Sequence, residues 1–321
     1  VDSAGKLGSS GSLTLTSAGT LSAKGQNLAA QTLKASAAHV DLSDSQTSAQ
    51  TVELTSTAGN LDLRRSRVTA SRTLTADANQ SLLSDAAQVG AAQISVTALD
   101  LSNVAGKWVQ TGSTGMQMTV ARSLDNSGGT LSSGGALGVS ADTLNNAGGL
   151  VQSGGLGDLA VSARQHLNNQ NGKLVTAAKL TLDGGTLDNS SGQITAGGAL
   201  GIKAAQLNNA NGTVAAAQTL TVKTDSLLNQ GGTLGSVAAD LIVNSDTGVL
   251  NNRGGRLEAA TALTLNAFGL NNQSGVITGA QLLLDTHGQQ LDNSAGTVNA
   301  SDTLGVDSGA LINDGGIMQA K

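Results

Sequence analysis

The 321-residue sequence contains no cysteine, no proline and no tyrosine, and it has a single tryptophan and a single phenylalanine. Without cysteine, disulfides and thiolate metal sites are excluded. Large aromatic side chains dominate ordinary cores and pockets, so an interior built only from leucine, valine, isoleucine and alanine must be narrow. Proline has no backbone N–H and cannot donate a hydrogen bond to a neighbouring strand. Its absence is therefore typical of a chain whose strands are hydrogen-bonded to neighbours on both edges.

Charge is also sparse. The chain has 17 Lys+Arg against 22 Asp+Glu, a formal net charge of −5. This balance argues against nucleic acid or an anionic membrane as a partner. No apolar run approaches transmembrane length, and nothing resembles a signal peptide. We therefore expect Val1 to begin a segment of a longer protein.

The sequence does contain a motif that recurs about every twenty residues: a leucine, one or two Asn/Asp residues and a glycine three or four positions later. Eight copies begin with Leu124-Asp125-Asn126, Leu144-Asn145-Asn146, Leu167-Asn168-Asn169, Leu187-Asp188-Asn189, Leu207-Asn208-Asn209, Leu250-Asn251-Asn252, Leu270-Asn271-Asn272 and Leu291-Asp292-Asn293, with variants at Leu228-Asn229 and Leu311-Ile312-Asn313. A unit this short cannot bury its own apolar face and must stack on copies of itself. The period therefore predicts a solenoid.

The unit from Leu187 to Gln206 shows how one turn of the solenoid is built. Apolar or small residues alternate with polar ones, in runs separated by Gly and Asn, at Ile194, Ala196, Leu200, Ile202 and Ala204. This is strand and corner chemistry, and it predicts about three short strands in each turn. Parallel crossovers are right-handed, so we expect a right-handed, all-β solenoid.

The register continues upstream without the Asn-Gly motif. Fourteen intervals between Leu21 and Leu311 average about 20.7 residues, which predicts about 15 turns. At about 4.8 Å per stacked strand, these turns would form a rod on the order of 70 Å long. We divide the chain into degenerate turns at residues 1–100 and regular turns at residues 101–321.

Each recurring residue of the motif has an expected role. The glycine should permit the positive φ of a tight corner. The second asparagine recurs at one register, so stacked copies should hydrogen-bond to one another in a structural ladder. The predicted ladder comprises Asn126, Asn146, Asn169, Asn189, Asn209, Asn252, Asn272, Asn293 and Asn313.

Residues suited to catalysis or metal binding are few. Glutamate occurs only at Glu53 and Glu258, and the three histidines, His39, His166 and His287, lie far apart in the sequence. Ligands of one metal must lie within a few ångströms, so no histidine pair is expected to form a site. We predict no cofactor and no metal. Paired carboxylates from adjacent turns could support glycosidase chemistry, and Asp41, Asp62 and Asp100 recur at similar positions of the early turns.

Two further features break the repeat. The cluster of Arg64, Arg65, Arg67 and Arg72 is the sharpest local concentration of charge, and it is the candidate contact for a polyanion such as a surface glycan.

The two aromatic residues differ in expected position. Trp108 falls on the inward position that Leu131 holds in the next turn, whereas Phe268 falls at an outer corner, where one exposed aromatic is no binding platform.

The motif Leu-Asn/Asp-Asn-x-x-Gly-x-Leu/Val/Ile, followed by Leu-x-Val/Ile-x-Ala/Ser, resembles the repeats of the filamentous haemagglutinin family. The resemblance is strong over residues 101–321 and rests on hydrophobic register alone over 13–100. It implies a right-handed parallel β-helix exported by Gram-negative bacteria through an outer-membrane partner, the two-partner secretion route. Such proteins are adhesins or the shafts of contact-dependent growth inhibition toxins. The family's N-terminal secretion domain and C-terminal effector domain have no counterpart in this sequence.

We therefore predict a non-enzymatic shaft segment of a secreted or surface-exposed exoprotein, which acts as a rigid spacer for a distal adhesive or toxic module. The implied partners are the two-partner secretion transporter, through a domain outside this sequence, and a receptor on a host cell or target bacterium. Open first and last turns predict weak end-to-end self-association. Two alternatives stand beside this interpretation: an adhesive surface that binds host glycan or protein, and a β-helical polysaccharide-processing enzyme.

Overall fold

The computed structural model describes residues 5–245 and 247–321, and these residues form 32 β-strands and no helix. The strands pair in parallel and build turns of about 20 residues, about 16 turns in all. The predicted all-β solenoid is therefore confirmed, with about one turn more than the motif count indicated. The chain divides into two compact units, Val1–Ala163 and Arg164–Lys321.

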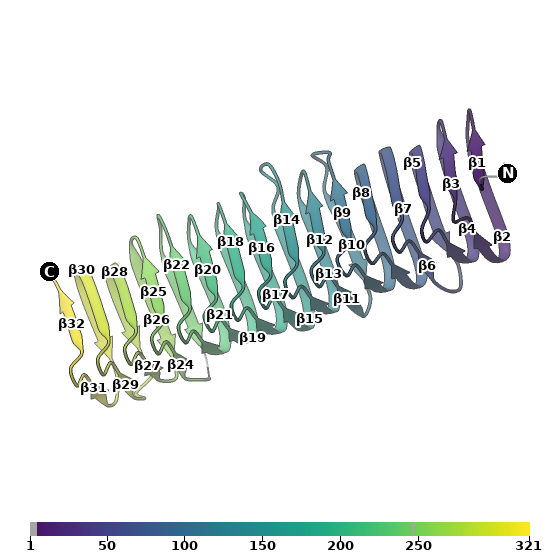
Figure 1. The fold of residues 1–321 in the computed structure, drawn as a ribbon. Helices are drawn as coiled ribbons and strands as arrows, with labels where there is room; N and C mark the ends of the chain where they lie inside the picture. The colour runs from purple at the N-terminus through teal and green to yellow at the C-terminus, as the bar shows by residue number, and fades with distance from the viewer. Residues whose placement is uncertain (1–4, 246) are drawn as a thin grey trace. The chain divides into compact units, whose positions relative to one another are not determined.

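The first unit contains strands of 2 to 17 residues that pair in parallel with strands of the neighbouring turns (Figure 1). Its strands are β1 (Lys6–Ser9), β2 (Leu13–Ser22), β3 (Gln26–Ala29), β4 (Thr32–Asp41), β5 (Gln46–Ser56), β6 (Leu61–Asp62), β7 (Arg67–Leu83), β8 (Gln88–Ser102), β9 (Lys107–Gln110), β10 (Met116–Val120), β11 (Ser123–Asp125), β12 (Thr130–Ser133), β13 (Leu137–Asn145) and β14 (Leu150–Ser153). The boundary between the units falls within β15 (Leu159–Asn168).

The second unit repeats the same pattern with greater regularity. Its strands are β16 (Lys173–Thr176), β17 (Leu180–Asp188), β18 (Gln193–Ala196), β19 (Leu200–Asn208), β20 (Thr213–Ala216), β21 (Leu220–Leu228), β22 (Thr233–Ser236), β23 (Leu241–Ser245), β24 (Leu250–Asn251), β25 (Arg256–Ala259), β26 (Ala262–Ala267), β27 (Leu270–Asn271), β28 (Val276–Asp285), β29 (Leu291–Asp292), β30 (Thr297–Asp307), β31 (Leu311–Ile312) and β32 (Ile317–Ala320).

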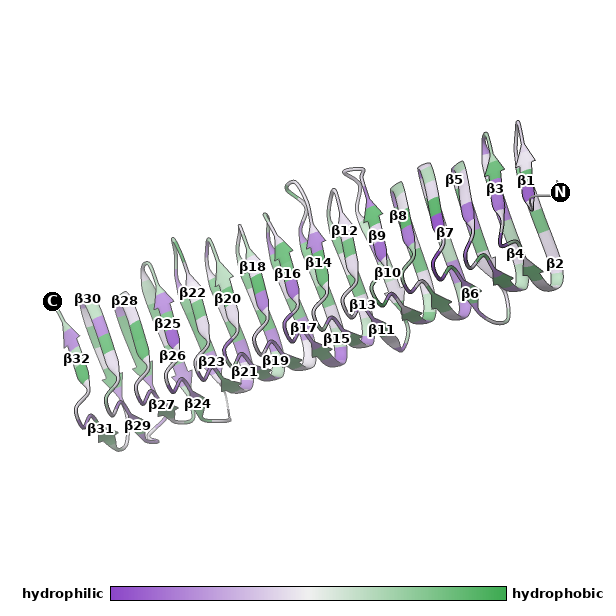
Figure 2. Cartoon of the chain, viewed as in Figure 1, coloured by the Kyte–Doolittle hydropathy of each residue, from purple (hydrophilic) through white to green (hydrophobic). Residues whose placement is uncertain are grey.

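One turn of the second unit shows where the core lies. Strand β18 supplies one side, which we call column A, and β19 supplies columns B (200–204) and C (206–208); the corner from Asn209 to Gly212 leads to the next column A. Alternate residues face inward, as expected for strands with one buried face. Figure 2 shows the resulting alternation of hydrophobic and hydrophilic residues along the strands. The predicted inward residues are all less than 9% exposed: Ile194, Ala196, Leu200, Ile202, Ala204 and Leu207.

The early turns of the first unit lack the Asn-Gly motif because their corners are packed differently. The position that aligns with the motif asparagine is occupied by Leu42 and Leu63, both fully buried, and then by Ser84. The prediction of a domain boundary between residues 100 and 101 reflects this change in sequence, and it stays a prediction. The compact units divide elsewhere, at Ala163 and Arg164.

Trp108 occupies the inward position opposite Leu131 and is fully buried, as predicted. Its indole Nε1 donates a 3.0 Å hydrogen bond to the Ser84 Oγ, so its one polar atom is satisfied in the core. One expectation about register is wrong. Leu227, not Leu228, aligns with the motif leucine Leu207, and Leu228 takes the outer position of Asn208.

Candidate functional site

The most regular polar feature of both units is a column of buried asparagines at the corner that follows column C. In the first unit, the Asn103 Nδ2 donates to the Asn126 Oδ1, and the Asn126 Nδ2 donates to the Asn146 Oδ1, each over 2.7 Å. In the second unit, equivalent bonds of 2.6 to 2.7 Å link Asn169, Asn189, Asn209, Asn229, Asn252, Asn272, Asn293 and Asn313. All of these side chains except that of Asn313 are buried, and they bond to one another and to corner carbonyls.

Each of these amides also stabilises the corner of its own turn. The Asn189 Nδ2 donates to the carbonyls of Gly192 and Thr213, each over 3.3 Å. Two asparagines of the column, Asn103 and Asn229, were not among those predicted. Asn229 follows the misaligned Leu228, and Asn103 belongs to the copy Leu101-Ser102-Asn103, in which serine replaces the first Asn/Asp.

The expected reason for the motif glycine is wrong. Positive φ belongs to the residue before it, for example Asn211 at 54°, Ser191 at 55° and Gly254 at 62°. The glycine itself has no positive φ, but a Cβ on Gly212 would lie 2.6 Å from the Asn209 Oδ1 and 3.0 Å from the Asn189 Nδ2. Its nearest neighbour would be the Asn189 backbone carbonyl oxygen, at 2.2 Å, so the glycine is required because the backbone of the preceding turn and the stacked amides leave no room for a side chain.

The predicted arginine cluster is largely neutralised by neighbouring carboxylates. Arg64 forms an ion pair with Asp62 at 2.5 Å, and Arg65 forms one with Asp44 at 2.7 Å. The hydrogen bond from Arg65 is the main reason that the pKa of the exposed Asp44 lies below its ordinary value. Arg64 and Arg65 are therefore poorly placed to attract a polyanion.

The other two arginines of the cluster lie on strand β7, and the structure separates them. The Arg67 Nη1 donates to the Gln88 Oε1 over 3.3 Å, and Arg67, Gln88 and Lys107 share one register position in successive turns. They flank a shallow cavity of about 230 Å³ in which Gly90 leaves space. Arg72 is exposed outside this cavity and, among the described residues, makes no polar contact. Arg67 and Lys107 are thus the cations that share one groove.

The aspartates considered for glycosidase chemistry form ordinary surface contacts. Asp41 and Asp62 do align in adjacent turns, but Asp100 does not join them, because Ser102 holds the aligned position. Burial raises the pKa of Asp41, but hydrogen bonds from Ser43 and the ion pair with Lys24 outweigh burial and leave its pKa below the ordinary value. Such a carboxylate does not hold the proton that a general acid must donate.

The three histidines contact different partners. The His39 Nδ1 accepts from the Asn60 N–H at 3.4 Å, and the His166 Nδ1 lies 2.6 Å from the Thr186 Oγ1. The His287 Nδ1 lies 3.5 Å from the Asp285 Oδ2. Within the part of the chain that the structure describes, no three His, Cys, Asp or Glu residues are grouped to hold a metal ion.

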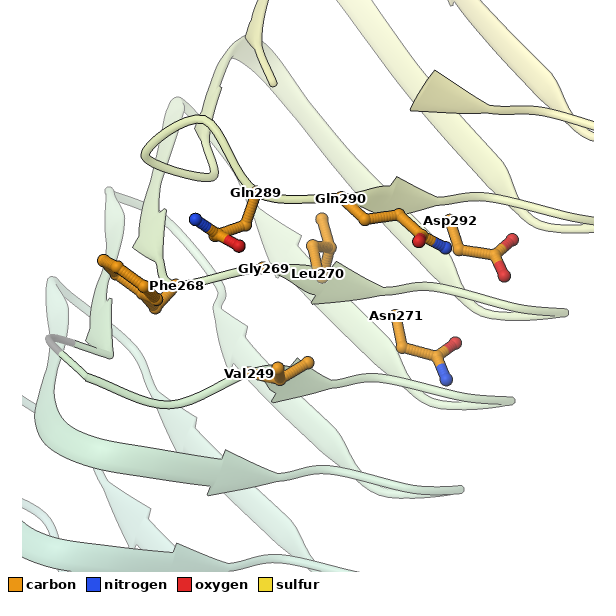
Figure 3. A pocket seen from close by; sticks show the side chains of 8 residues that line it. All are labelled: Val249, Phe268, Gly269, Leu270, Asn271, Gln289, Gln290 and Asp292. Atoms are coloured by element: carbon orange, nitrogen blue, oxygen red, sulfur yellow. The ribbon is translucent and has the colours of Figure 1, made fainter. Parts of the chain in front are cut away.

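A cavity of about 250 Å³ opens on the surface of the second unit beside Phe268, which is 45% exposed (Figure 3). It is lined by Val249, Phe268, Gly269, Leu270, Asn271, Gln289, Gln290 and Asp292. These residues come from three successive turns, whose motif leucines Leu250, Leu270 and Leu291 stack on one another. Phe268 lies at the predicted outer corner, but it is not an isolated exposed aromatic as expected, because it lines this cavity together with Asn271, Gln289 and Gln290. The sequence pattern did not predict the cavity, and its one signal is the four-residue connection that precedes Leu250 and Leu291, where regular turns have two residues.

A family model of the haemagglutinin repeat matches residues 1–64, 53–106, 101–164, 156–211, 204–247, 237–295 and 281–321. The chain belongs to the haemagglutinin repeat family. This assignment agrees with the resemblance carried by the Leu-Asn-Asn motif and extends it over the degenerate turns of residues 1–100.

A curated relative with related repeats is "Toxin CdiA" of Yersinia pestis, which is 37% identical over 193 residues. The match covers 57% of this haemagglutinin repeat chain and 6% of that protein, so the chain spans a small part of the relative's length. No solved structure matches the chain significantly. The described residues contain no helix that could cross a membrane.

Proposed function

We propose that this haemagglutinin repeat chain is a shaft segment: a rigid spacer that holds a binding or toxic module of a bacterial exoprotein away from the cell surface. The observation that carries this proposal is that successive turns repeat the same register and the same buried positions. In the second unit, register partners such as Lys173, Gln193 and Thr213 follow one another at 20-residue intervals with the same buried positions. A stack of equivalent turns can be lengthened without a change in its core.

The polar contacts of the turns favour a mechanical role. Every asparagine of the column is used within the stack, and Arg64, Arg65 and Asp41 are held in ion pairs. A shaft needs stiffness along its length, and stacked hydrogen-bonded turns supply it. We propose no catalytic step for this segment, because the described carboxylates and histidines are not brought together in a reactive group.

The family and the relative named as a toxin support a place for the segment in a secreted or surface-exposed protein of the adhesin or contact-dependent growth inhibition type. The partner that this implies is an outer-membrane transporter of the two-partner secretion route, which would recognise a domain outside these residues. A receptor on a host cell or target bacterium would be contacted by a distal module. The absence of cysteine suits export of an unfolded chain, because no disulfide can form on the way.

The spacer role can be tested by changing the number of turns. Deletion of residues 193–212 removes one turn and joins Gly192 to Thr213, which preserves the register. The chain should then fold with the same β-sheet circular dichroism and cooperative unfolding, shorter by about 4.7–4.9 Å. Deletion of residues 193–202 is the matched control, because it removes half a turn and should abolish cooperative unfolding.

The biological consequence requires a displayed module. The chain is placed between a surface anchor and a reporter binding domain, and capture of target cells is measured with turns removed or duplicated in register. We expect capture to depend on the number of turns and to survive exchange of exposed residues. Capture that is independent of length, or cleavage of a polysaccharide by the purified chain, would contradict the spacer role.

A further inference from the structure

The cavity beside Phe268 results from longer connections in the two turns on either side of it, whereas the turn of Phe268 keeps the two-residue spacing found between Ala204 and Leu207. Between columns B and C, two residues separate Ala267 from Leu270, whereas four separate Ser245 from Leu250 in the preceding turn. In the following turn four residues separate Thr286 from Leu291. Two long connections therefore flank a short one, and the short one forms the floor of a recess.

Gly269 keeps the recess open. Its φ is 107°, which side chains rarely adopt, and a Cβ there would meet the Val249 Cγ2 at 3.4 Å and the Gln289 Cβ at 3.7 Å. Other turns carry a side chain at this position before the motif leucine, such as Thr186 and Gln206. The side chain that fills this position in other turns is missing at Gly269, and the space that it would occupy is part of the cavity.

The walls of the cavity combine one aromatic face with amide groups. Figure 3 shows Phe268 and Gln289 at one end and Gln290 and Asp292 at the other. The Phe268 ring is supported by the His287 imidazole, with ring centroids 6.3 Å apart and planes inclined by 35°. Exposed aromatic rings are rare in this chain, since Phe268 is its single phenylalanine and Trp108 is buried.

The backbone around the amides is fixed while their side chains remain available. The Gln289 N–H donates to the Thr286 carbonyl over 2.9 Å, and the Gln289 carbonyl accepts from the Gly309 N–H over 2.9 Å. The Gln290 carbonyl accepts from the Leu270 N–H over 2.9 Å. Among the described residues, neither glutamine side chain makes a hydrogen bond, so each offers a carbonyl oxygen and an NH₂ group.

Two further polar groups face the same cavity. The Asn271 Oδ1 accepts from the Gln273 N–H over 3.0 Å, which leaves its NH₂ group without a partner among the described residues. Asp292 accepts from the Ser294 Oγ over 2.6 Å and from the Gln273 Nε2 over 2.7 Å, and its carboxylate keeps further lone pairs. The lining contains this carboxylate and no lysine or arginine. An anionic ligand would therefore meet repulsion.

We propose that this cavity binds a neutral sugar residue of a surface glycan. A sugar ring has an apolar C–H face, which would pack on Phe268 and Val249, and a rim of hydroxyls, which both donate and accept hydrogen bonds as the Gln289, Gln290 and Asn271 amides do. The cavity volume of about 250 Å³ lies just below the roughly 300–1,000 Å³ of pockets for drug-sized ligands, which suits one sugar ring. The spacer role does not depend on this site.

The test is a titration of the isotopically labelled chain, followed by amide NMR. The probes are glucose, galactose, mannose, fucose, N-acetylglucosamine and N-acetylgalactosamine, with N-acetylneuraminic acid as the anionic counterpart. At up to about 10 mM sugar, tenfold above a dissociation constant of about 1 mM, at least one neutral sugar should shift Gly269 and the glutamine side chains. N-acetylneuraminic acid should not shift them.

Variants assign the binding to the cavity. Phe268→Ala and Gln290→Ala should each weaken binding by about fivefold or more. Leu283→Ala removes another large, exposed apolar side chain, 51% exposed and outside the cavity, and should leave binding unchanged. Thermal unfolding of each variant checks that the fold is intact. No shift with any neutral sugar, tighter binding of N-acetylneuraminic acid, or unchanged binding in Phe268→Ala would overturn the proposal.

Discussion

Gly212 packs so closely against Asn209 that a Cβ on the glycine would lie 2.6 Å from the Asn209 Oδ1. The same relationship joins Gly192 to Asn189 and Gly232 to Asn229. Where Leu63 replaces the asparagine, Ser66 occupies the glycine position and donates its hydroxyl to the Leu63 carbonyl. Asparagine and glycine are therefore exchanged together at the corner, as one packing unit.

Gly212→Ala should destabilise the second unit by about 1–3 kcal/mol, the usual cost of overpacking. Gly201→Ala is the matched control, because a Cβ at Gly201 meets nothing within 4 Å and its φ is not positive. The control should be neutral or slightly stabilising, since alanine loses less backbone entropy than glycine on folding. Urea unfolding followed by circular dichroism measures both. Equal midpoints for the two variants would refute the steric account of the glycine.

Asn209→Ala should lower the stability by about 3 kcal/mol or more. The substitution leaves the Asn229 Oδ1 without its donor and removes the 2.7 Å acceptor of the Asn189 Nδ2, which then keeps only its 3.3 Å bonds to the Gly192 and Thr213 carbonyls. Each buried unsatisfied group costs about 1–3 kcal/mol. Asn208→Ala is the control, since that half-buried side chain caps its corner outside the column. Denaturant midpoints should separate the two variants clearly. A loss no larger than that of Asn208→Ala would show that the column contributes little.

Trp108→Ala should destabilise the first unit by about 3–5 kcal/mol, because it leaves a cavity at a fully buried position. Trp108→Leu should cost less, since Leu131 fills the equivalent position of the next turn. The indole also reports on its surroundings, and its fluorescence should be blue-shifted and poorly quenched by acrylamide in the folded protein. Efficient quenching in the folded state would contradict the buried position.

The stability contributed by Asp292 should be lost at low pH. Hydrogen bonds from the Ser294 hydroxyl and N–H, and from Gln273, hold the pKa of Asp292 below its ordinary value of 3.8 in the folded chain. The unfolded chain then binds the proton more readily, so the contribution is complete above pH 3.8 and disappears as the pH falls through the lower folded pKa. Denaturant midpoints of wild type and Asp292→Asn, compared from about pH 7 to about pH 3, should converge as the pH falls. A constant difference would refute the linkage.

Any polyanion binding should depend on Arg67 and Lys107, which flank one groove, rather than on Arg64 and Arg65, which are ion-paired. Elution from a heparin column as a function of salt measures this. The double variant Arg67→Gln with Lys107→Gln should elute at lower salt than wild type, because two phosphate-like or sulfate contacts are lost. The control, Arg64→Gln with Arg65→Gln, should elute close to wild type. If the Arg64/Arg65 double variant elutes at lower salt than the Arg67/Lys107 double variant, Arg64 and Arg65 are the polyanion contact after all.

The period and the alternation predicted the solenoid, its inward residues and the register of most asparagines, because each depends on spacing along the chain alone. The register of Leu227 was missed because two adjacent leucines fit the same spacing. Asp100 was assigned to the wrong position because Leu99-Asp100-Leu101 repeats the string Leu61-Asp62-Leu63, although Leu101, and not Leu99, aligns with Leu61. The role of Gly212 and the cavity beside Gly269 depend on distances between stacked turns, which become visible only when neighbours are superposed.

The asparagine columns also have a direction. Within each unit, the bonds between asparagines of the column run from the Nδ2 of one turn to the Oδ1 of the next higher-numbered turn, as from Asn252 to Asn272 and from Asn272 to Asn293. The side-chain amide dipoles therefore align and polarise one another, as peptide dipoles do in a helix. A turn stacked on the higher-numbered end of a column must therefore offer an acceptor, and one stacked on the lower-numbered end must offer a donor, so the two ends of each stack are chemically different.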